Sequence, residues 1–363
     1  MEHLRIPGPT PCPEEVLQAM ARQMINHRGV EFAQILSDVT AKLKLLFQTK
    51  NDVLLLTSSG TGGLEAAIVN TLSPGDKVLS VSIGVFGDRF ASIAKQFGAD
   101  VIPLNFEWGK AAEVDAIRRA LQAEPEIKAV MVTHNETSTG VTNDLASISA
   151  VVKEFDKLLL VDAISSLGSI NVPVDDWHLD VAITGSQKGW MVPPGLAMVS
   201  VSPAAWQAHA KAKMPRFYWD FSKAKKSLEN NETPWTPAVS VVFALSVALE
   251  MNLKEGLPNI DARHARVGRV TREGVKSLGL SLFADEAHAS NTVTAVAATN
   301  GLDAKKLNKI MREEHQVVLA GGQQSLGGKI FRIGHLGWVT EADIEIVMSA
   351  LKIALPKAGL VKP

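Results

Sequence analysis

Residues 53–63 have the sequence Val53-Leu54-Leu55-Leu56-Thr57-Ser58-Ser59-Gly60-Thr61-Gly62-Gly63. The apolar run predicts a buried β-strand over residues 53–57, and the spacing that follows predicts a helix that begins at Leu64. Glycines between a strand and a helix let backbone amides approach an anion, and the helix N-terminus adds a partial positive charge. The stretch therefore predicts a phosphate cradle, with an unliganded turn as the alternative. It is not a dinucleotide fingerprint, because Glu65 stands where the third glycine would be.

The alternation of strand and helix continues from about residue 50 to residue 200. Short apolar runs predict seven strands, at residues 53–57, 77–82, 100–104, 129–133, 157–161, 181–184 and 196–200. Intervening segments have helical spacing, at residues 64–72, 90–97, 113–122 and 145–155. Helices that connect successive strands place those strands in parallel. The pattern predicts an α/β domain with a doubly wound, mostly parallel sheet of seven strands.

The pattern changes in the C-terminal part of the chain. An apolar helix is expected over residues 238–253. Beyond residues 255–260, helices are predicted at 262–278, 304–314 and 341–355, and strands at 292–297, 317–320 and 330–333. We expect three parts: an N-terminal arm (1–20), a large α/β domain (21–257) and a smaller α+β domain (258–363).

The net charge of the chain is close to zero. Lys plus Arg number 37 and Asp plus Glu number 38, for a net charge of -1, so no global field attracts nucleic acid or an anionic membrane. Residues 211–227 are basic and aromatic, but a single stretch of this kind is more typical of a solvated loop than of a nucleic-acid platform. We expect neither nucleic acid nor a membrane as a partner.

Cysteine usage and the first residues bear on the cellular compartment. Cys12 is the only cysteine, which excludes an intramolecular disulfide and a site with several cysteine ligands. The N-terminal segment has no basic stretch followed by an apolar one, the pattern of a signal peptide. The histidines show no metal-ligand spacing. We expect a cytoplasmic protein without a metal site.

Two charged residues follow predicted strands of the large domain. Asp162 ends the apolar run at 158–161, and Lys188 follows the strand at 181–184, next to Trp190. Ligands of open α/β sheets bind at the carboxyl ends of the strands, so both side chains are candidates for a site. Burial would lower the pKa of Lys188 and leave a reactive amine for a Schiff base. The alternatives are a capping role for Asp162 and a solvated surface position for Lys188.

Two further stretches are candidates for binding. Thr133-His134-Asn135-Glu136-Thr137-Ser138-Thr139-Gly140 follows the strand at 129–133, and its hydroxyl and amide groups suit the polar substituents of a ring; the alternative is a strand-to-loop transition with capping residues. Arg332 lies in the apolar strand at 330–333. A buried guanidinium requires an anion, either a ligand carboxylate or a structural partner.

Together these motifs resemble those of the class V, fold type I aminotransferases that use pyridoxal phosphate, and most of all the alanine/serine-glyoxylate aminotransferase group. The residues that carry the resemblance lie at 8–11, 58–63, 133–140, 161–163, 185–188, 193–195 and 331–334. The motifs follow the family's order over essentially the whole chain. The resemblance implies the family's fold, with a large domain on a mostly parallel seven-stranded sheet and a smaller α+β C-terminal domain.

The resemblance also implies roles for individual residues. Lys188 would join the cofactor as a Schiff base and then carry the proton between Cα and C4′, while Asp162 would keep the pyridinium nitrogen protonated. Arg332 would bind the substrate carboxylate, and Gly8 would lie at the substrate site. The other cofactor-binding residues that it implies are Ser59, Gly60, Thr61, Gly62, Phe86, Thr137, Gln187, Thr233 and Thr236.

These residues would contact different parts of the cofactor. Thr137 would lie near its phenolic oxygen, and Phe86 would stack on its ring, where some relatives have tryptophan. Thr233, a position that can be tyrosine in relatives, and Thr236 would reach the phosphate of the neighbouring subunit, which implies a homodimer with shared active sites. The phosphate of the same subunit would be held by Gly60, Thr61, Gly62 and Gln187.

The function that the resemblance implies is transfer of an amino group from a small amino acid, alanine or serine, to glyoxylate or pyruvate by a ping-pong mechanism. The donors and the acceptors remain open, because a methylene or hydroxyl group changes binding in an apolar pocket by only about 1 to 3 kcal/mol. Two different functions also stay open: a lyase that uses the same cofactor, and a non-catalytic companion subunit that retains the fold. A cysteine desulfurase is disfavoured, because it needs a mobile cysteine and Cys12 lies in the N-terminal arm.

Overall fold

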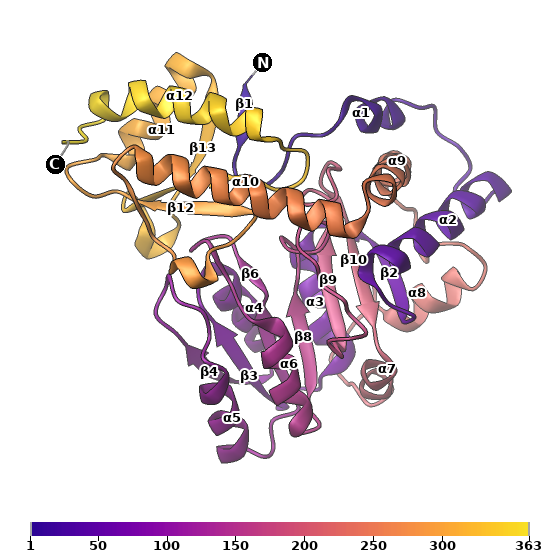
Figure 1. Ribbon diagram of the computed structural model, residues 1–363. Helices are drawn as coiled ribbons and strands as arrows, with labels where there is room; N and C mark the ends of the chain where they lie inside the picture. The colour runs from indigo at the N-terminus through magenta and orange to yellow at the C-terminus, as the bar shows by residue number, and fades with distance from the viewer. Residues whose placement is uncertain (1, 362–363) are drawn as a thin grey trace.

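The computed structural model describes residues 2–361, which form two main β-sheets surrounded by helices (Figure 1). The larger sheet has the seven strands that the sequence predicts. In spatial order they are β2 (Asp52–Ser58), β10 (Gly195–Val201), β9 (Val181–Gly185), β8 (Leu158–Asp162), β5 (Ala129–Thr133), β3 (Lys77–Ser82) and β4 (Asp100–Asn105). Strand β10 is antiparallel to both of its neighbours, and the other pairs are parallel. The prediction of a mostly parallel sheet is confirmed.

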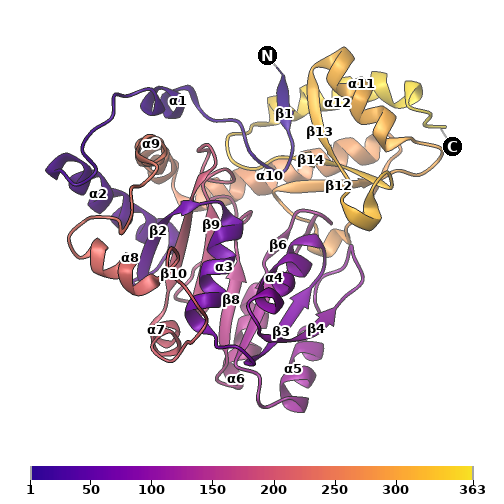
Figure 2. The same cartoon turned by 180° about the vertical axis from the view of Figure 1, so that it is seen from behind.

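Helices cover both faces of this sheet, which is why its strands are almost continuously apolar. Successive residues of β2 alternate between the two faces: Val53 and Leu55 belong to one apolar core, and Leu54 and Leu56 to the other. The first core is covered by α2 (Val30–Phe47), α5 (Val114–Ala123), α6 (Leu145–Glu154) and α9 (Val239–Glu255). The second is covered by α3 (Gly60–Thr71), α4 (Val85–Gln96), α7 (Pro203–His209) and α8 (Phe221–Leu228). Figure 2 shows α3 and α4 on the face opposite to α6.

The second main sheet combines the C-terminal strands with the start of the chain. In spatial order it contains β1 (His3–Arg5), β13 (Val317–Gly321), β14 (Ile330–Gly334), β12 (Val293–Ala297) and β11 (Ser281–Leu282). Phe331 and Ile333 of β14 lie in the apolar core that this sheet forms with α10 (Leu257–Ser277), α11 (Ala304–His315) and α12 (Glu341–Lys357). The helices and strands expected after residue 260 are therefore present. Strand β1, which pairs in parallel with β13, is an addition to the predicted elements.

Several short elements complete the described part of the chain. They are α1 (Glu14–Met20), the hairpin of β6 (Asn135–Glu136) and β7 (Val141–Thr142), and the 3-10 helices η1 (Glu286–His288) and η2 (Gln324–Leu326). The apolar helix expected at 238–253 is α9, and it packs against α1 and α2. No helix within residues 2–361 combines the length and the apolar character needed to span a bilayer. The division at residues 20 and 257 stays a proposal, with β1 joining the arm to the smaller domain.

Three predicted boundaries on the large domain are wrong. Helix α3 begins at Gly60 rather than at Leu64, because the glycines form its first turn. A Cβ on Gly63 would lie 2.6 Å from Cγ2 of Ile183 in β9. Glycine therefore lets the helix lie directly on the sheet. Helix α4 begins at Val85 rather than at residue 90, because its first amides bond to side chains from another part of the chain. The loop expected at 211–227 contains the start of α8, which Asp220 caps by accepting from the amides of residues 222 and 223.

Candidate active site

The carboxyl ends of β2, β3, β5, β8 and β9 lie at the same edge of the large sheet, because these strands run in the same direction. Residues just after these ends surround a cavity of about 160 Å³. The predicted site residues in its wall are Ser59, Gly60, Thr61, Phe86, Thr137, Asp162, Gln187 and Lys188. The position agrees with the general location of ligands in open α/β sheets.

Lys188 lies beneath the N-terminal segment of the chain. Its Nζ donates a hydrogen bond to the carbonyl oxygen of Pro7. Thr10 binds the backbone of the loop that carries Lys188. The Thr10 amide donates to the Gln187 carbonyl oxygen at 3.1 Å, and its Oγ1 donates to the Lys188 carbonyl oxygen at 3.0 Å. A Cβ on Gly8 would lie 2.7 Å from Nζ. Burial lowers the pKa of Lys188 to about 8, against the opposing effect of the Asp162 charge. The solvated alternative is therefore wrong, because Nζ is hydrogen-bonded to Pro7 and the side chain lines the cavity. The lowered pKa favours the neutral form of the amine.

Asp162 ends β8 and is almost fully buried, with 3% of its surface exposed. Its Oδ1 accepts a hydrogen bond of 3.0 Å from the amide of Ile164. This is the local capping role that the sequence left open for Asp162, and it occupies one of the two carboxylate oxygens. Within residues 2–361, no protein group donates to Oδ2. Burial raises the pKa of Asp162 to about 7, with the Ile164 hydrogen bond and the Lys188 charge opposing this shift and Glu136 adding to it. A buried carboxylate with an open oxygen suits a protonated ring nitrogen.

The first turn of α3 lies at the same cavity. Amides at the start of a helix have no intrahelical acceptor, and those of Gly60, Thr61 and Gly62 hold the first positions of α3. The side chain of Ser59, the N-cap residue, accepts no hydrogen bond from them. Gln187 also lines the cavity, and Nε2 is the atom of its carboxamide that can donate to an anion. Unpaired donors at a helix N-terminus suit a phosphate group.

Phe86 forms an aromatic wall of the cavity. It lies in the first turn of α4, and its ring faces the guanidinium of Arg89, whose Cζ is 4.8 Å from the ring centroid. Arg89 itself lines the cavity. A cation over one face of the ring is a stabilising contact, and an aromatic face suits stacking against a flat ligand.

Arg332 of β14 lies where the smaller sheet meets the cavity loop. The side chain is 6% exposed, and it donates through Nη1 to the carbonyl oxygen of Thr137 at 2.8 Å and through Nε to that of Gly321 at 3.0 Å. Burial lowers its pKa to about 10, opposed by the charge of Glu136. No carboxylate of residues 2–361 forms an ion pair with Arg332, so the structural partner that the sequence left open is absent there. The guanidinium retains capacity for a ligand carboxylate.

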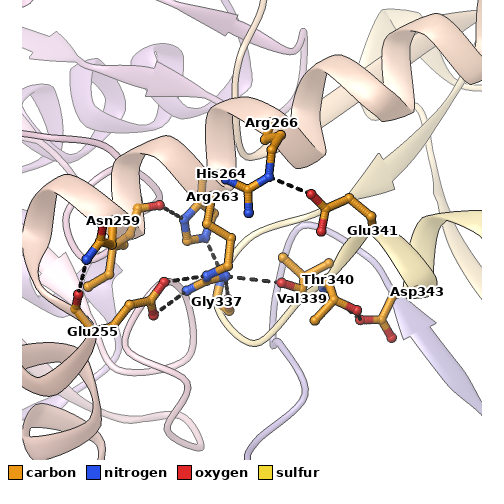
Figure 3. Close-up of polar contacts among 11 residues, drawn as sticks. Glu255, Asn259, Arg263, His264, Arg266, Gly337, Val339, Thr340, Glu341 and Asp343 are labelled. Carbon is orange, nitrogen blue, oxygen red and sulfur yellow. Dashed lines mark hydrogen bonds and ion pairs between the residues drawn. The ribbon is translucent and has the colours of Figure 1, made fainter.

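The segment after Arg332 is fixed to α10 by a second polar cluster (Figure 3). Arg263 pairs with both carboxylate oxygens of Glu255, at 2.6 and 2.9 Å, and donates to the carbonyl oxygen of Gly337 at 2.9 Å. His264 Nε2 accepts from the Gly337 amide at 3.1 Å. Gly337 lies against the backbone of Lys188, where a Cβ would be 3.0 Å from the lysine carbonyl oxygen. The cluster therefore fixes the position of Gly337, which packs against the backbone of the lysine loop.

The structure does not bring every predicted residue to this cavity. Thr233 is buried elsewhere, with its Oγ1 donating to the carbonyl oxygen of Trp235 at 2.7 Å, and Thr236 is exposed. Their implied contact is with a neighbouring subunit, and it stays a prediction. Gly62 does not line the cavity wall, although its amide belongs to the first turn of α3. Gly8 and Arg332 do not line it either: Gly8 lies against the side chain of Lys188, and Arg332 binds the carbonyl oxygen of Thr137.

Sequence reasoning missed several residues of the cavity wall, namely Leu64, Arg89, Asn135, Ile164 and Ser165. Asn135 lies in the polar stretch already singled out, and its Nδ2 donates to Ser165 Oγ and to Thr292 Oγ1, both at 2.8 Å. Arg89 follows Phe86 by one helical turn, a signal that becomes visible once α4 is known to begin at Val85. Nothing in the sequence around Ser165 distinguishes it from other serines.

The residues of the cavity fit pyridoxal phosphate. The buried amine of Lys188 suits its aldehyde, the open oxygen of Asp162 suits its ring nitrogen, and the unpaired amides of α3 suit its phosphate. These groups line one cavity together with the ring of Phe86. These groups therefore match the aldehyde, the ring nitrogen and the phosphate of the cofactor that the resemblance implies.

Comparison with known proteins agrees with this fit. The family model described as aminotransferase class-V matches residues 3–345. The chain is 48% identical to a soluble hydrogenase 42 kDa subunit of Anabaena cylindrica, over 98% of this chain and 94% of that protein. It is 39% identical to an L-aspartate–glyoxylate aminotransferase of Paracoccus denitrificans, over 98% and 91% of the two chains.

A solved structure shares the whole fold. The alanine–glyoxylate aminotransferase from Nostoc sp. superimposes with a TM-score of 0.94 at 30% identity, covering 98% of this chain and 95% of that chain. A family model that spans nearly the whole length and a structural match of this coverage agree with the cavity chemistry. The chain therefore belongs to the class-V aminotransferase family and is a pyridoxal-phosphate-dependent transaminase.

Proposed function

We propose that this transaminase moves the amino group of a small amino acid, alanine or serine, to glyoxylate or pyruvate. The observation that carries the proposal is the buried amine of Lys188 in one cavity with the open carboxylate oxygen of Asp162. The names of two matched aminotransferases support glyoxylate as the acceptor. One of those names has aspartate as the donor, so aspartate belongs in any test of the donor.

Each charged residue of the site would have its own role in the reaction. When bound, pyridoxal phosphate supplies a ring that accepts the electrons left when the bond between Cα and its hydrogen breaks. Nζ of Lys188 takes the proton from the substrate Cα, for which a pKa near the working pH is favourable. Asp162 holds the proton on the ring nitrogen through Oδ2. Arg332 orients the α-carboxylate of the substrate with the part of its guanidinium that does not bind Thr137.

Other residues would bind the cofactor and cover Lys188. The first turn of α3, with Ser59, Thr61 and Gln187, holds the phosphate, while Phe86 and Thr137 contact the ring and its phenolic oxygen. The N-terminal segment that contains Gly8 lies over the side chain of Lys188 and accepts a hydrogen bond from its Nζ.

We also propose a homodimer in which Thr233 and Thr236 complete the phosphate site of the neighbouring subunit. Their distance from the cavity of their own chain supports this arrangement, because neither lines it. We place the protein in the cytoplasm, as expected from its sequence. Light scattering of the purified protein tests the dimer, and T233A should weaken cofactor binding without unfolding the chain.

A panel of donors and acceptors tests the reaction. Purified protein loaded with pyridoxal phosphate is assayed with alanine, serine and aspartate against glyoxylate and pyruvate, and the kcat/KM values are compared. We expect the highest values for alanine or serine with glyoxylate or pyruvate, and parallel lines in double-reciprocal plots, as a ping-pong mechanism requires. Intersecting lines, or a donor preference for aspartate alone, would contradict the proposal.

A non-catalytic companion subunit is the second candidate, because a relative with 48% identity is named as a hydrogenase subunit. The two candidates differ in the first half-reaction. A working transaminase changes its absorbance spectrum when the amino acid alone is added, and it releases the corresponding oxo acid in an amount equal to the active sites. A passive companion binds the cofactor without either change.

A further inference from the structure

Glu136 is a buried carboxylate to which the proposed reaction assigns no task. It ends β6, and none of its surface is exposed. Its Oε2 accepts hydrogen bonds from the amides of Phe86, at 3.0 Å, and Gly87, at 3.1 Å. Its Oε1 accepts from the amide and the hydroxyl of Ser138, at 3.0 and 2.6 Å. A side chain from the hairpin thus caps α4.

The hydrogen-bond pattern fits the ionised form of this carboxylate. All four contacts are made by N–H or O–H donors, and a protonated carboxyl group would need an acceptor for its own proton. Burial raises the pKa of Glu136, while the hydrogen bonds from Ser138, Gly87 and Phe86 lower it. The N-terminus of α4 also favours a negative charge at this point.

The neighbours of Glu136 connect the first turn of α4 with strand β14 of the smaller sheet. Ser138 Oγ, which donates to Glu136, accepts from the amide of Val85 at 3.0 Å. Between them, the carbonyl oxygen of Thr137 accepts from Arg332 at 2.8 Å. One short stretch of the hairpin therefore holds the helix turn that carries Phe86 and the strand that carries Arg332.

We propose that Glu136 is a positioning residue, which fixes the first turn of α4, with Phe86, relative to the loop whose Thr137 carbonyl oxygen binds Arg332. Its value for catalysis rests on the proposed function. Its structural effect belongs to the chain itself and is measurable without the reaction.

Two variants separate geometry from charge. In E136Q one side of the new carboxamide is a donor, so it faces either the two amides of α4 or the amide and hydroxyl of Ser138. The Ser138 hydroxyl can turn to accept, so at least one backbone amide loses its acceptor. In S138A the contact with Val85 is lost and the charge of Glu136 stays. D303N is the matched control, because Asp303 also accepts from two helix amides, at 2.9 and 3.0 Å, but at the start of α11 and outside the cavity.

The first measurement is hydrogen–deuterium exchange of the cofactor-free chain, in peptides that cover residues 83–90. Loss of a capping free energy of about 1 to 2 kcal/mol should make the exchange of these amides faster by roughly 5- to 30-fold. We expect this increase in E136Q and S138A and no change in D303N. If E136Q does not fold, the exchange rate in S138A is sufficient for the test. Unchanged exchange in both variants would overturn the positioning role.

The second measurement is steady-state kinetics with cofactor and substrate present. E136Q should raise KM and lower kcat together, because Phe86 and Arg332 no longer keep their relative positions, while D303N should leave both constants unchanged. Unchanged constants in E136Q would overturn the positioning role. Absence of transamination by the wild type would instead refute the proposed function and leave the exchange results intact.

Discussion

Arg332 donates a hydrogen bond of 2.8 Å to the carbonyl oxygen of Thr137, so a strand of the smaller sheet holds a loop of the large domain at the edge of the cavity. The contact uses one part of a guanidinium that has no carboxylate partner among residues 2–361. A ligand carboxylate that binds the rest of the guanidinium would therefore bridge the two sheets through one side chain.

Replacement of Arg332 tests this bridge. In R332K the charge stays but the fork that binds Thr137 and a carboxylate together is lost. We expect KM for alanine to rise by about 10- to 100-fold, as for loss of one charge-assisted hydrogen bond of about 1.5 to 3 kcal/mol, with a smaller change in kcat. Steady-state kinetics with alanine and glyoxylate measure both constants.

The methyl ester of alanine is the control for the Arg332 variant. It has the reacting amine but no carboxylate, so R332K should alter its rate of reaction in the first half-reaction much less than that of alanine. Equal losses for the ester and the acid would show that Arg332 acts by holding Thr137 and not by binding the carboxylate.

Gly8 provides a test of the segment over Lys188. A Cβ at this position would lie 2.7 Å from Nζ and from Cδ of the lysine, and the backbone φ of +114° is itself unfavourable for alanine. G8A should displace the amine and reduce cofactor attachment by at least tenfold, as measured by titration of the cofactor absorbance. G75A is the matched control, because Gly75 has a φ of +85° and nothing within 4 Å of its Cβ position. Equal effects of the two variants would assign the loss to backbone strain alone.

Asp162 should make the stability of the cofactor-free chain depend on pH. Its folded-state pKa of about 7 lies above the ordinary value of 3.8, so the folded chain holds a proton that the unfolded chain has already lost. The free energy of unfolding should therefore fall as the pH rises through this range, by about 1.4 kcal/mol per unit of pKa difference at most. D162N removes this loss. Urea unfolding at pH 5 and pH 8 should show the variant gaining stability relative to the wild type at the higher pH.

A constant difference between D162N and the wild type at the two pH values would contradict that assignment. The measurement stays at or below pH 8, because Lys188 has a lowered pKa of about 8 and stabilises the chain in the opposite direction as the pH rises further. The variant should also lose catalysis when loaded with the cofactor, since the proton on the ring nitrogen is then no longer held by a charge.

The architecture of the large domain was predictable because its signals are local. Each strand is a short apolar run ended by a turn, and the charged residues Asp162 and Lys188 stand where two of these runs end. Directional strands then place such residues at one edge without further information. The same reasoning predicted the three longer strands and the helices of the smaller domain but not the two-residue strand β11. It also missed β1, whose three residues pair with β13, more than 300 positions later in the chain.

The parts that the sequence did not predict depend on contacts between distant residues. The start of α4 is set by Glu136 and Ser138, about 50 residues after the amides that they cap, and capping rules consider only neighbours in the sequence. The position of Arg89 in the cavity wall was not predicted for the same reason, because it depends on where α4 begins. The early start of α3 reflects the close approach of Gly63 to Ile183, a tertiary contact that outweighs the low helix propensity of glycine.

The central claim is that the amine of Lys188 binds pyridoxal phosphate covalently, and borohydride reduction tests it most directly. The protein is incubated with the cofactor, reduced, digested and analysed by mass spectrometry, with K188A as the control. We predict a yellow protein, one reduced adduct per chain on the peptide that contains Lys188, and a folded K188A variant that carries no adduct and shows no turnover. A colourless wild-type protein, or an adduct on another lysine with Lys188 unmodified, would contradict the claim.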